Sequence, residues 1–159
     1  MSIRVGMGYD VHRVQAGRPL VLGGVRFESE WGLEGHSDAD VLSHAVGDAL
    51  LGAAALGDLG QHFPPGSRKW KDVSSLHLLE LIAGLLAKAG ARVGNVDVMM
   101  VAEAPKIAPH REAMCANIAK ALGVDAKRIS VKATTNETLG AIGRHEGLAA
   151  MAVALVEMD

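Results

Sequence analysis

The segment from Gly35 to Gly60, GHSDADVLSHAVGDALLGAAALGDLG, is the most informative part of the sequence for the architecture of the chain. Its apolar residues recur at the spacing of a helix, which predicts a helix from about Asp38 to Leu56, with Ser37 as its N-cap. The predicted apolar face consists of Val41, Leu42, Ala45, Val46, Ala49, Leu50 and Ala53.

A polar stripe runs beside this apolar face. Asp40, His44 and Asp48 are spaced four residues apart, so a helix places them on one side. We interpret His44 as a metal ligand. We expect Asp40 or Asp48 to accept a hydrogen bond from its second ring nitrogen and so set its tautomer.

Composition indicates one globular domain, residues 1–159. Hydrophobic residues make up 49% of the chain but aromatic residues only 3%, so the predicted core is aliphatic. The net charge is −2 with scattered Lys and Arg, which argues against a nucleic-acid partner. Cys115 is the single cysteine, and we find no membrane span or leader peptide, so we expect a cytosolic (cytoplasmic) protein without a membrane partner.

Periodicity and turn residues predict the other elements. In order they are a strand from Ile3 to Val14, a hairpin from Pro19 to Phe27 turning at Gly23-Gly24, a helix from Ser74 to Ala89, a strand from Asn95 to Ala102, a helix from His110 to Leu122, and strands from Ile129 to Ala133 and from Gly147 to Met158. Loops are expected from Asp58 to Lys71 and from Thr134 to Glu146. This order indicates an α/β (α+β) sandwich with one mixed four-stranded sheet, a small hairpin and helices on one face.

The last strand is apolar on both faces from Leu148 to Val156. Helices in a chain of this length cover one face of a sheet, so a second copy of the chain is a natural cover for the other. We therefore expect a homo-oligomer with its sheets turned inward. A strand buried on both faces within a monomer explains the pattern equally well.

Asp10 and His12 are two residues apart, so a strand points them to the same side. Together with His44 they form a carboxylate and two imidazoles, a set that binds zinc and leaves a fourth position open. The same ligands also suit iron or manganese. Short motifs of this kind also arise by chance, with His44 an ordinary helix histidine.

Larger blocks of sequence resemble one family. They are Gly8-Tyr-Asp-Val-His12, Gly35-His-Ser-Asp-Ala-Asp-Val-Leu-Ser-His44, Gly57-Asp-Leu-Gly-Gln-His-Phe-Pro64, Gly94-Asn-Val-Asp97, Ala104-Pro-Lys106, Val131-Lys-Ala-Thr-Thr-Asn-Glu137-Thr-Leu-Gly140 and Gly143-Arg144. Collinear along nearly the whole chain, they resemble 2-C-methyl-D-erythritol 2,4-cyclodiphosphate synthase of the non-mevalonate isoprenoid (isoprene) biosynthesis pathway.

The resemblance implies a metal-dependent lyase that converts 4-diphosphocytidyl-2-C-methyl-D-erythritol 2-phosphate to the cyclic diphosphate and CMP. The 2-phosphate attacks the β-phosphorus and CMP leaves. Asp10, His12 and His44 match the family's zinc ligands, and Glu137 matches its ligand for a second cation, magnesium (Mg²⁺) or Mn²⁺. His36 and Thr135 match the positions that orient the phosphates and stabilise the transition state.

The family also implies a substrate site between subunits of a homotrimer. Residues 102–108 match its cytidine pocket, and residues 58–60 match a segment that contacts the sugar or the erythritol hydroxyls. Arg144 matches a loop near the trimer axis, where either an ion pair with Glu146 or a bound anion is expected. The implied substrate-binding residues are Asp10, His12, His36, Ser37, Asp58, Leu59, Gly60, Phe63, Pro64, Pro65, Gly66, Ser67, Ala102, Glu103, Ala104, Pro105, Lys106, Ile107, Ala108, Thr134, Thr135, Asn136, Glu137, Ala141 and Arg144.

The chain departs from the family pattern at two places: Pro65-Gly66 replaces a common acidic residue, and Ala141-Ile142 replaces a common aromatic one. Neither touches the metal or phosphate ligands. Two other functions remain open from the residues alone. A zinc phosphohydrolase would release inorganic phosphate, and a non-catalytic oligomeric binding protein would not turn over substrate.

Overall fold

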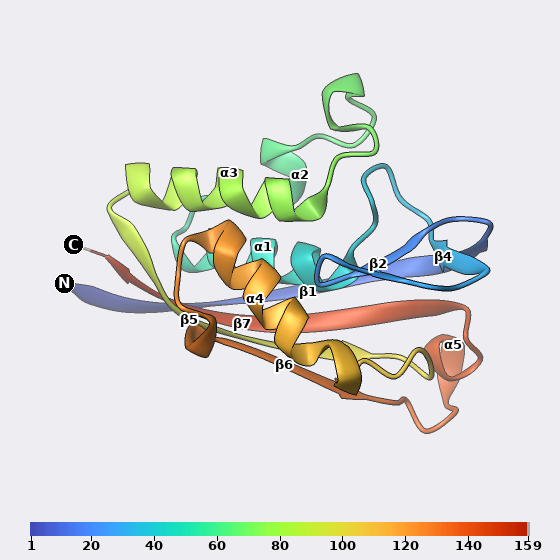
Figure 1. Ribbon diagram of the computed structural model, residues 1–159. Coiled ribbons are helices and arrows are strands. Elements are labelled where there is room, and N and C mark those ends of the chain that lie inside the picture. Colours follow the sequence, from blue (N-terminus) through green and yellow to red (C-terminus); the bar gives the residue numbers. More distant parts are fainter. Residues whose placement is uncertain (159) are drawn as a thin grey trace.

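The computed structural model describes residues 1–158 and contains a five-stranded sheet with the strand order β4-β1-β7-β5-β6. Neighbouring strands are antiparallel except β5 and β6, which are parallel. The longer helices lie on one side of this sheet (Figure 1). The strands are β1 (Ser2–Ala16), β4 (Trp31–Leu33), β5 (Ala91–Val101), β6 (Ile129–Thr134) and β7 (Gly147–Met158).

The prediction of a mixed sheet with helices on one face is confirmed, but the predicted number of four strands is wrong. The additional strand is β4, which pairs antiparallel with the end of β1, Trp31 opposite Ala16 and Leu33 opposite Val14. Three residues are too few to show the alternation that identifies a strand in sequence. The predicted hairpin forms a separate two-stranded sheet, β2 (Leu20–Leu22) with β3 (Val25–Phe27).

Three longer helices make the second layer: α1 (Val41–Ala53), α3 (Ser75–Lys88) and α4 (Arg111–Leu122). α4 ends at Leu122, as predicted, because the next residue, Gly123, adopts the left-handed conformation that closes a helix. The loops contain short helical turns: α2 (Leu59–His62), α5 (Gly140–Gly143), η1 (Arg68–Trp70), η2 (Ala108–His110) and η3 (Ala126–Arg128). Among residues 1–158, no helix has both the length and the apolar character needed to cross a membrane.

α1 begins later than predicted because its N-cap is Asp40 and not Ser37. The Asp40 side chain accepts a hydrogen bond from the backbone N–H of Ser43, which leaves Ser37 in the preceding loop. The helix ends at Ala53, since Ala55 two residues further on adopts a positive φ of 57°. Consequently His36 does not lie at the start of a helix.

Two glycines let α1 lie directly on β1. A Cβ atom on Gly8 would be 2.0 Å from the carbonyl oxygen of Ala45, and one on Gly6 would be 2.1 Å from that of Ala49. Only a residue without a side chain permits this approach of backbone to backbone. The contact sets the height of α1, and with it His44, above the strand that carries Asp10 and His12.

The face of the sheet away from the helices is apolar and exposed. On β1 the exposed fractions are 70% for Ile3, 64% for Val5 and 71% for Met7, and on β7 they are 44% for Met151 and 49% for Val153. We call this surface, completed by Tyr9 and Val11, the outer sheet face. Burial of both faces of β7 within the monomer is therefore wrong.

Candidate active site

β1 and α1 bring the three predicted metal ligands together. Asp10 and His12 point to the helix-covered side of the sheet, where His44 reaches them from α1. Asp10 Oδ2 lies 2.8 Å from His12 Nε2 and 3.1 Å from His44 Nδ1, and the two ring nitrogens are 3.1 Å apart. Since ligand atoms around a tetrahedral zinc ion lie about 3.3 Å apart, the residues present fit such an ion.

The outer ring nitrogens of both histidines are hydrogen-bonded. His12 Nδ1 donates to the carbonyl oxygen of Glu34 at 2.6 Å, which leaves Nε2 free to bind a cation. His44 Nε2 lies 2.9 Å from Ser75 Oγ and 3.1 Å from Ser37 Oγ. Two serine hydroxyls thus occupy the place that we predicted for a carboxylate.

The prediction that Asp40 or Asp48 accepts this hydrogen bond is wrong. Asp48 Oδ1 instead accepts from the backbone N–H of Leu59 at 2.8 Å. Asp40 precedes the helix proper and turns toward the β2–β3 hairpin. There its carboxylate accepts from the backbone N–H groups of Gly23 at 2.9 Å and Gly24 at 2.8 Å, as well as from Ser43.

Asp40 therefore joins the hairpin to the start of α1. Burial and the charge of nearby Asp38 raise the pKa of Asp40, although its hydrogen bonds from Gly23, Gly24 and Ser43 favour the carboxylate. The side chain is fully buried, so its role is to cap and anchor, not to contact a ligand.

The charges of the metal-ligand cluster are interdependent. Burial alone would raise the pKa of Asp10, but hydrogen bonds and charge from His12 and His44 lower it to about 2. Burial alone would lower the pKa of His12, but the hydrogen bond and charge of Asp10 outweigh burial and raise it. A carboxylate held anionic beside two imidazoles is a suitable environment for a divalent cation.

These ligands line a cavity of about 220 Å³. His36 closes one side, with Nε2 donating to the carbonyl oxygen of Ser67 at 2.8 Å. Arg18 holds the His36 backbone from both sides, because its guanidinium donates to the carbonyl oxygens of Gly35 at 3.1 Å and Ser37 at 3.0 Å. The other lining residues are Ser37, Asp48, Leu59, Gly60, Phe63, Pro65, Trp70, Val73 and Leu78.

A second cavity, of about 240 Å³, lies where the loops after β5 and β6 meet. The predicted residues that line it are Ala102, Glu103, Pro105, Lys106, Ile107, Ala108, Thr134 and Thr135, joined by Met100, Arg111 and Ala133. Among the described residues none lines both this cavity and the metal-ligand cavity. Within one chain the predicted site residues are thus divided between two cavities.

The remaining predicted residues lie outside both cavities. Asp58 is the N-cap of α2, accepting from Gln61 N–H at 2.9 Å. Arg144 forms the predicted ion pair with Glu146, at 2.7 Å, on the surface. Seven further predicted residues line neither cavity: Pro64, Gly66, Ser67, Ala104, Asn136, Glu137 and Ala141.

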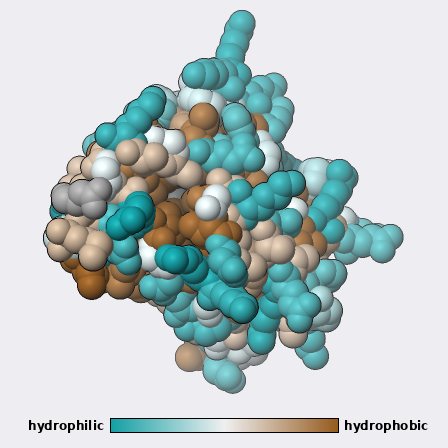
Figure 2. Space-filling view, turned by 60° about the vertical axis from the view of Figure 1, so that its left-hand side comes forward, coloured by the Kyte–Doolittle hydropathy of each residue, from teal (hydrophilic) through white to brown (hydrophobic). Residues whose placement is uncertain are grey.

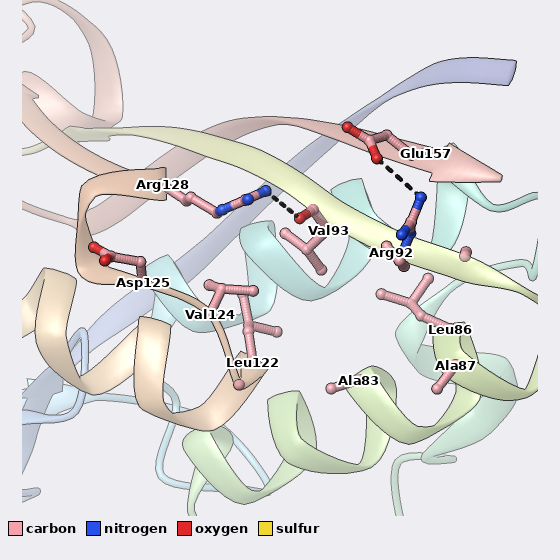
Figure 3. Close-up of a pocket in the computed structure, with 12 residues that line it drawn as sticks. Ala83, Leu86, Ala87, Arg92, Val93, Leu122, Val124, Asp125, Arg128 and Glu157 are labelled. Atoms are coloured by element: carbon pink, nitrogen blue, oxygen red, sulfur yellow. Dashed lines mark hydrogen bonds and ion pairs between the residues drawn. The ribbon is translucent and has the colours of Figure 1, made fainter. Parts of the chain in front are cut away.

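A third cavity, of about 500 Å³, lies at the end of the sheet where β5 begins and β7 ends. Figure 2 shows this end, with apolar surface framed by polar side chains. The charged groups there are already partnered: Arg128 donates to the carbonyl oxygen of Val93 at 3.2 Å, and Arg92 pairs with Glu157 at 3.4 Å (Figure 3). No predicted site residue lines it.

Sequence reasoning missed Asp38, Ser75 and Arg18. Asp38 lies within the quoted stretch, but nothing in its spacing shows that its partner is Ser75, 37 residues later. Arg18 lies 19 residues before the Ser37 carbonyl that it holds. Contacts over such separations leave no periodic signal in a single sequence.

Comparison with known proteins identifies the family. A model of the YgbB family matches residues 3–157. The chain therefore belongs to the YgbB family.

Relatives in this family give the particular enzyme. The 2-C-methyl-D-erythritol 2,4-cyclodiphosphate synthase of Thermosynechococcus vestitus is 55% identical over 157 residues, which cover 99% of this chain and 98% of that protein. The homologue from Symbiobacterium thermophilum, which has the same name, is 59% identical over 152 residues, 96% of this chain and 97% of that protein. The predicted family and its cyclase function are confirmed.

A solved structure carries a relevant ligand. The IspF complex with CDP from Plasmodium falciparum has a TM-score of 0.87 and 34% identity, and the alignment covers 99% of this chain and 97% of that one.

Proposed function

We propose that the chain performs its cyclase reaction at a metal-dependent site formed between neighbouring subunits of a homotrimer. The observation that carries the metal assignment is the convergence of Asp10, His12 and His44, whose ligand atoms all lie within 4.8 Å of one another. The substrate is 4-diphosphocytidyl-2-C-methyl-D-erythritol 2-phosphate, and the products are 2-C-methyl-D-erythritol 2,4-cyclodiphosphate and CMP.

The three ligands hold one zinc ion per subunit. Bound there, zinc supplies a Lewis acid that polarises a phosphoryl oxygen and neutralises its charge. The outer hydrogen bonds of His12 and His44 keep their inner nitrogens aimed at the ion. Asp10 contributes the negative charge, since its pKa of about 2 keeps it ionised at neutral pH.

His36 and Thr135 orient the phosphates for in-line transfer. An oxygen of the 2-phosphate forms a bond to the β-phosphorus, while the bond from that phosphorus to the oxygen it shares with the α-phosphorus breaks. The electron pair leaves with CMP. His36 is suited to this role because Arg18 and the Ser67 carbonyl hold its backbone and ring in place.

Glu137 would hold the second cation, Mg²⁺ or Mn²⁺, which prefers oxygen ligands and would neutralise charge on the diphosphate. It stands in an exposed turn at a positive φ of 51°, and its backbone N–H donates to Thr135 Oγ1 at 3.2 Å. The same turn therefore carries a hydroxyl and a carboxylate side chain. The hydroxyl can donate to a diphosphate oxygen, and the carboxylate is an oxygen ligand of the kind that such cations prefer.

The cytidine moiety occupies the cavity between the loops after β5 and β6, formed by residues 102–108 and 134–135. The CDP complex of the Plasmodium falciparum relative supports a cytidine diphosphate-linked substrate. Leu59 and Gly60, which line the metal-ligand cavity, serve the methylerythritol portion with Asp58 and the segment from Phe63 to Ser67.

Two observations support the homotrimer. The outer sheet face is too apolar to remain in water. The substrate must also contact two cavities, and no described residue lines both of them. A site between neighbouring subunits meets this requirement, because each subunit then contributes one of the two cavities. We propose that each subunit is one domain over residues 1–159, the last of which lies outside the described residues, and that the enzyme is cytoplasmic.

The test is phosphorus NMR of the purified protein with the cytidyl diphosphate substrate and Mg²⁺. We expect two coupled diphosphate signals and an equivalent amount of CMP, and their loss in His44→Ala. His77→Ala is the matched control, because His77 is an exposed helical histidine whose partner is Glu80. Inorganic phosphate without the cyclic product would indicate a phosphohydrolase, and no turnover by folded, zinc-loaded protein would indicate a binding protein.

A further inference from the structure

We infer that Ser75 and Asp38 are positioning residues for the metal centre: they hold the ring of His44 so that Nδ1 faces Asp10 and His12. The inference rests on the proposed function only in assuming that a metal binds there. Neither residue belongs to the predicted ligands or to the predicted substrate site.

Ser75 joins His44 to Asp38. Ser75 is the first residue of α3, is 1% exposed, and its Oγ lies 2.9 Å from His44 Nε2. The same hydroxyl is hydrogen-bonded to Asp38 Oδ1, while the Ser75 backbone N–H donates to Asp38 Oδ2 at 3.0 Å. The backbone N–H of Asp40 donates to Asp38 Oδ1 at 3.2 Å, so the carboxylate is held in one orientation.

The direction of these hydrogen bonds follows from what each group can donate. An ionised carboxylate only accepts, so the single hydroxyl hydrogen of Ser75 points to Asp38. Ser75 Oγ then offers His44 only lone pairs, and His44 Nε2 must carry a hydrogen. Nδ1 is left as the ligand atom, and it is this atom that lies 3.1 Å from both Asp10 Oδ2 and His12 Nε2.

Ser37 shares the Nε2 hydrogen, since its Oγ lies 3.1 Å away and also accepts from the backbone N–H of Ala39 at 3.1 Å. Loss of Ser75 alone is therefore partly compensated.

His12 is oriented differently, by the backbone carbonyl of Glu34, which no side-chain substitution removes. The orientation of His44 depends on side chains and can be tested. Outer partners of this kind change metal affinity by about 10- to 100-fold when they are removed. We therefore expect zinc affinity, and not only activity, to depend on Asp38 and Ser75.

Asp38→Asn tests the inference more directly than Ser75→Ala does. The amide has one oxygen for two backbone donors, the Ser75 N–H at 3.0 Å and the Asp40 N–H at 3.2 Å. With its oxygen on the shorter of these two, its NH₂ group faces the Asp40 N–H and Ser75 Oγ, and it turns the hydroxyl hydrogen toward His44 Nε2. That arrangement favours the tautomer with hydrogen on Nδ1, the atom needed by the metal. We expect the zinc dissociation constant to rise about 10- to 100-fold in Asp38→Asn.

We expect a smaller rise in Ser75→Ala, because Ser37 remains. Matched controls are Asp72→Asn, an exposed aspartate just before α3, and Ser74→Ala, the exposed N-cap of α3 whose side chain makes no capping hydrogen bond. Zinc affinity is measured by competition with a chromophoric chelator, and denaturant unfolding of metal-free protein shows whether each variant is folded.

Nitrogen-15 NMR of zinc-loaded wild type is the second readout and needs no variant to fold. We expect the His44 hydrogen on Nε2, exchanging slowly with water, and faster exchange in Ser75→Ala. A hydrogen on Nδ1 in wild type, or wild-type zinc affinity in both Asp38→Asn and Ser75→Ala, would overturn the inference. Absence of zinc binding by wild type overturns it together with the metal assignment, whereas zinc binding without cyclic product overturns the proposed function alone.

Discussion

The carboxylate of Glu103 accepts a hydrogen bond of 2.9 Å from the backbone N–H of Thr138. The same oxygen, Oε1, also accepts from the backbone N–H of Asn136 at 3.2 Å. Glu103 follows β5 and the two N–H donors follow β6, so one side chain joins the loop after β5 to the turn that carries Thr135 and Glu137. That turn has positive φ angles of 51° at Glu137 and 60° at Thr138 and depends on such anchoring.

We predict that Glu103→Ala lowers kcat about 10- to 100-fold, because the turn that presents Thr135 and Glu137 is no longer held in place. Glu103→Gln should retain most of the activity, since its amide oxygen accepts the same two N–H groups. Steady-state kinetics with CMP detection measures both. Glu28→Ala, at an exposed position outside the site, is the control, and equal activity of Glu103→Ala and wild type would contradict the prediction.

Gly8→Ala is predicted to destabilise the protein by at least about 3 kcal/mol, because its Cβ cannot coexist with the Ala45 carbonyl oxygen and α1 must move off β1. Gly84→Ala is the matched control. Gly84 lies exposed within α3 with no atom within 4 Å of an added Cβ, so alanine should stabilise by about 0.5–1 kcal/mol. Urea unfolding of the metal-free proteins measures both changes.

The metal-ligand cluster predicts opposite pH dependence with and without zinc. The pKa of His12 is raised above its ordinary value of 6.5. The Asp10–His12 pair therefore stabilises the metal-free protein fully below pH 6.5, and this stabilisation is lost as the pH rises through the raised pKa. In acid, the lowered pKa of Asp10 stabilises the folded protein fully above pH 3.8, the ordinary pKa of the group. This stabilisation is lost as the pH falls toward the lowered pKa of about 2. Zinc competes with protons for the same ligand atoms, so the stabilisation of the folded protein by bound zinc increases with pH.

Thermal unfolding with chelator and with zinc, at about pH 6 and about pH 8, tests this dependence near the histidine pKa. His12→Asn supplies the reference, because the Asp10 ion pair is absent in it. We expect the advantage of metal-free wild type over His12→Asn to shrink from the lower to the higher pH. An advantage that grows with pH would contradict the assigned direction of the His12 pKa.

Met7→Glu on the outer sheet face is predicted to convert the proposed trimer to monomers. Burying a methionine contributes about 1.5–3 kcal/mol, whereas an unpaired carboxylate buried in the same interface costs more than that. Sedimentation velocity measures the mass, and we expect cyclase activity to be lost while circular dichroism stays unchanged. Ala116→Glu, exposed on α4, is the control. A monomeric wild type would contradict the trimer itself.

Much of the fold and part of the site follow from local sequence. The two-residue spacing of Asp10 and His12 predicted that both point to the same side of a strand, since side chains alternate. Gly123 predicted the end of α4, and Gly23-Gly24, with φ of 55° and 72°, the turn of the hairpin. Each of these features depends on the conformation of a few neighbouring residues.

Contacts between distant residues were decided by the tertiary structure alone. β4 is a strand only because β1 is beside it, and Asp40 caps α1 and reaches the hairpin because that hairpin packs against the helix start. The outer nitrogen of His44 meets Ser75, 31 residues away, because α3 begins next to α1. Spacing along a sequence determines which side a residue faces, whereas the partner that it meets there depends on the packing of whole elements.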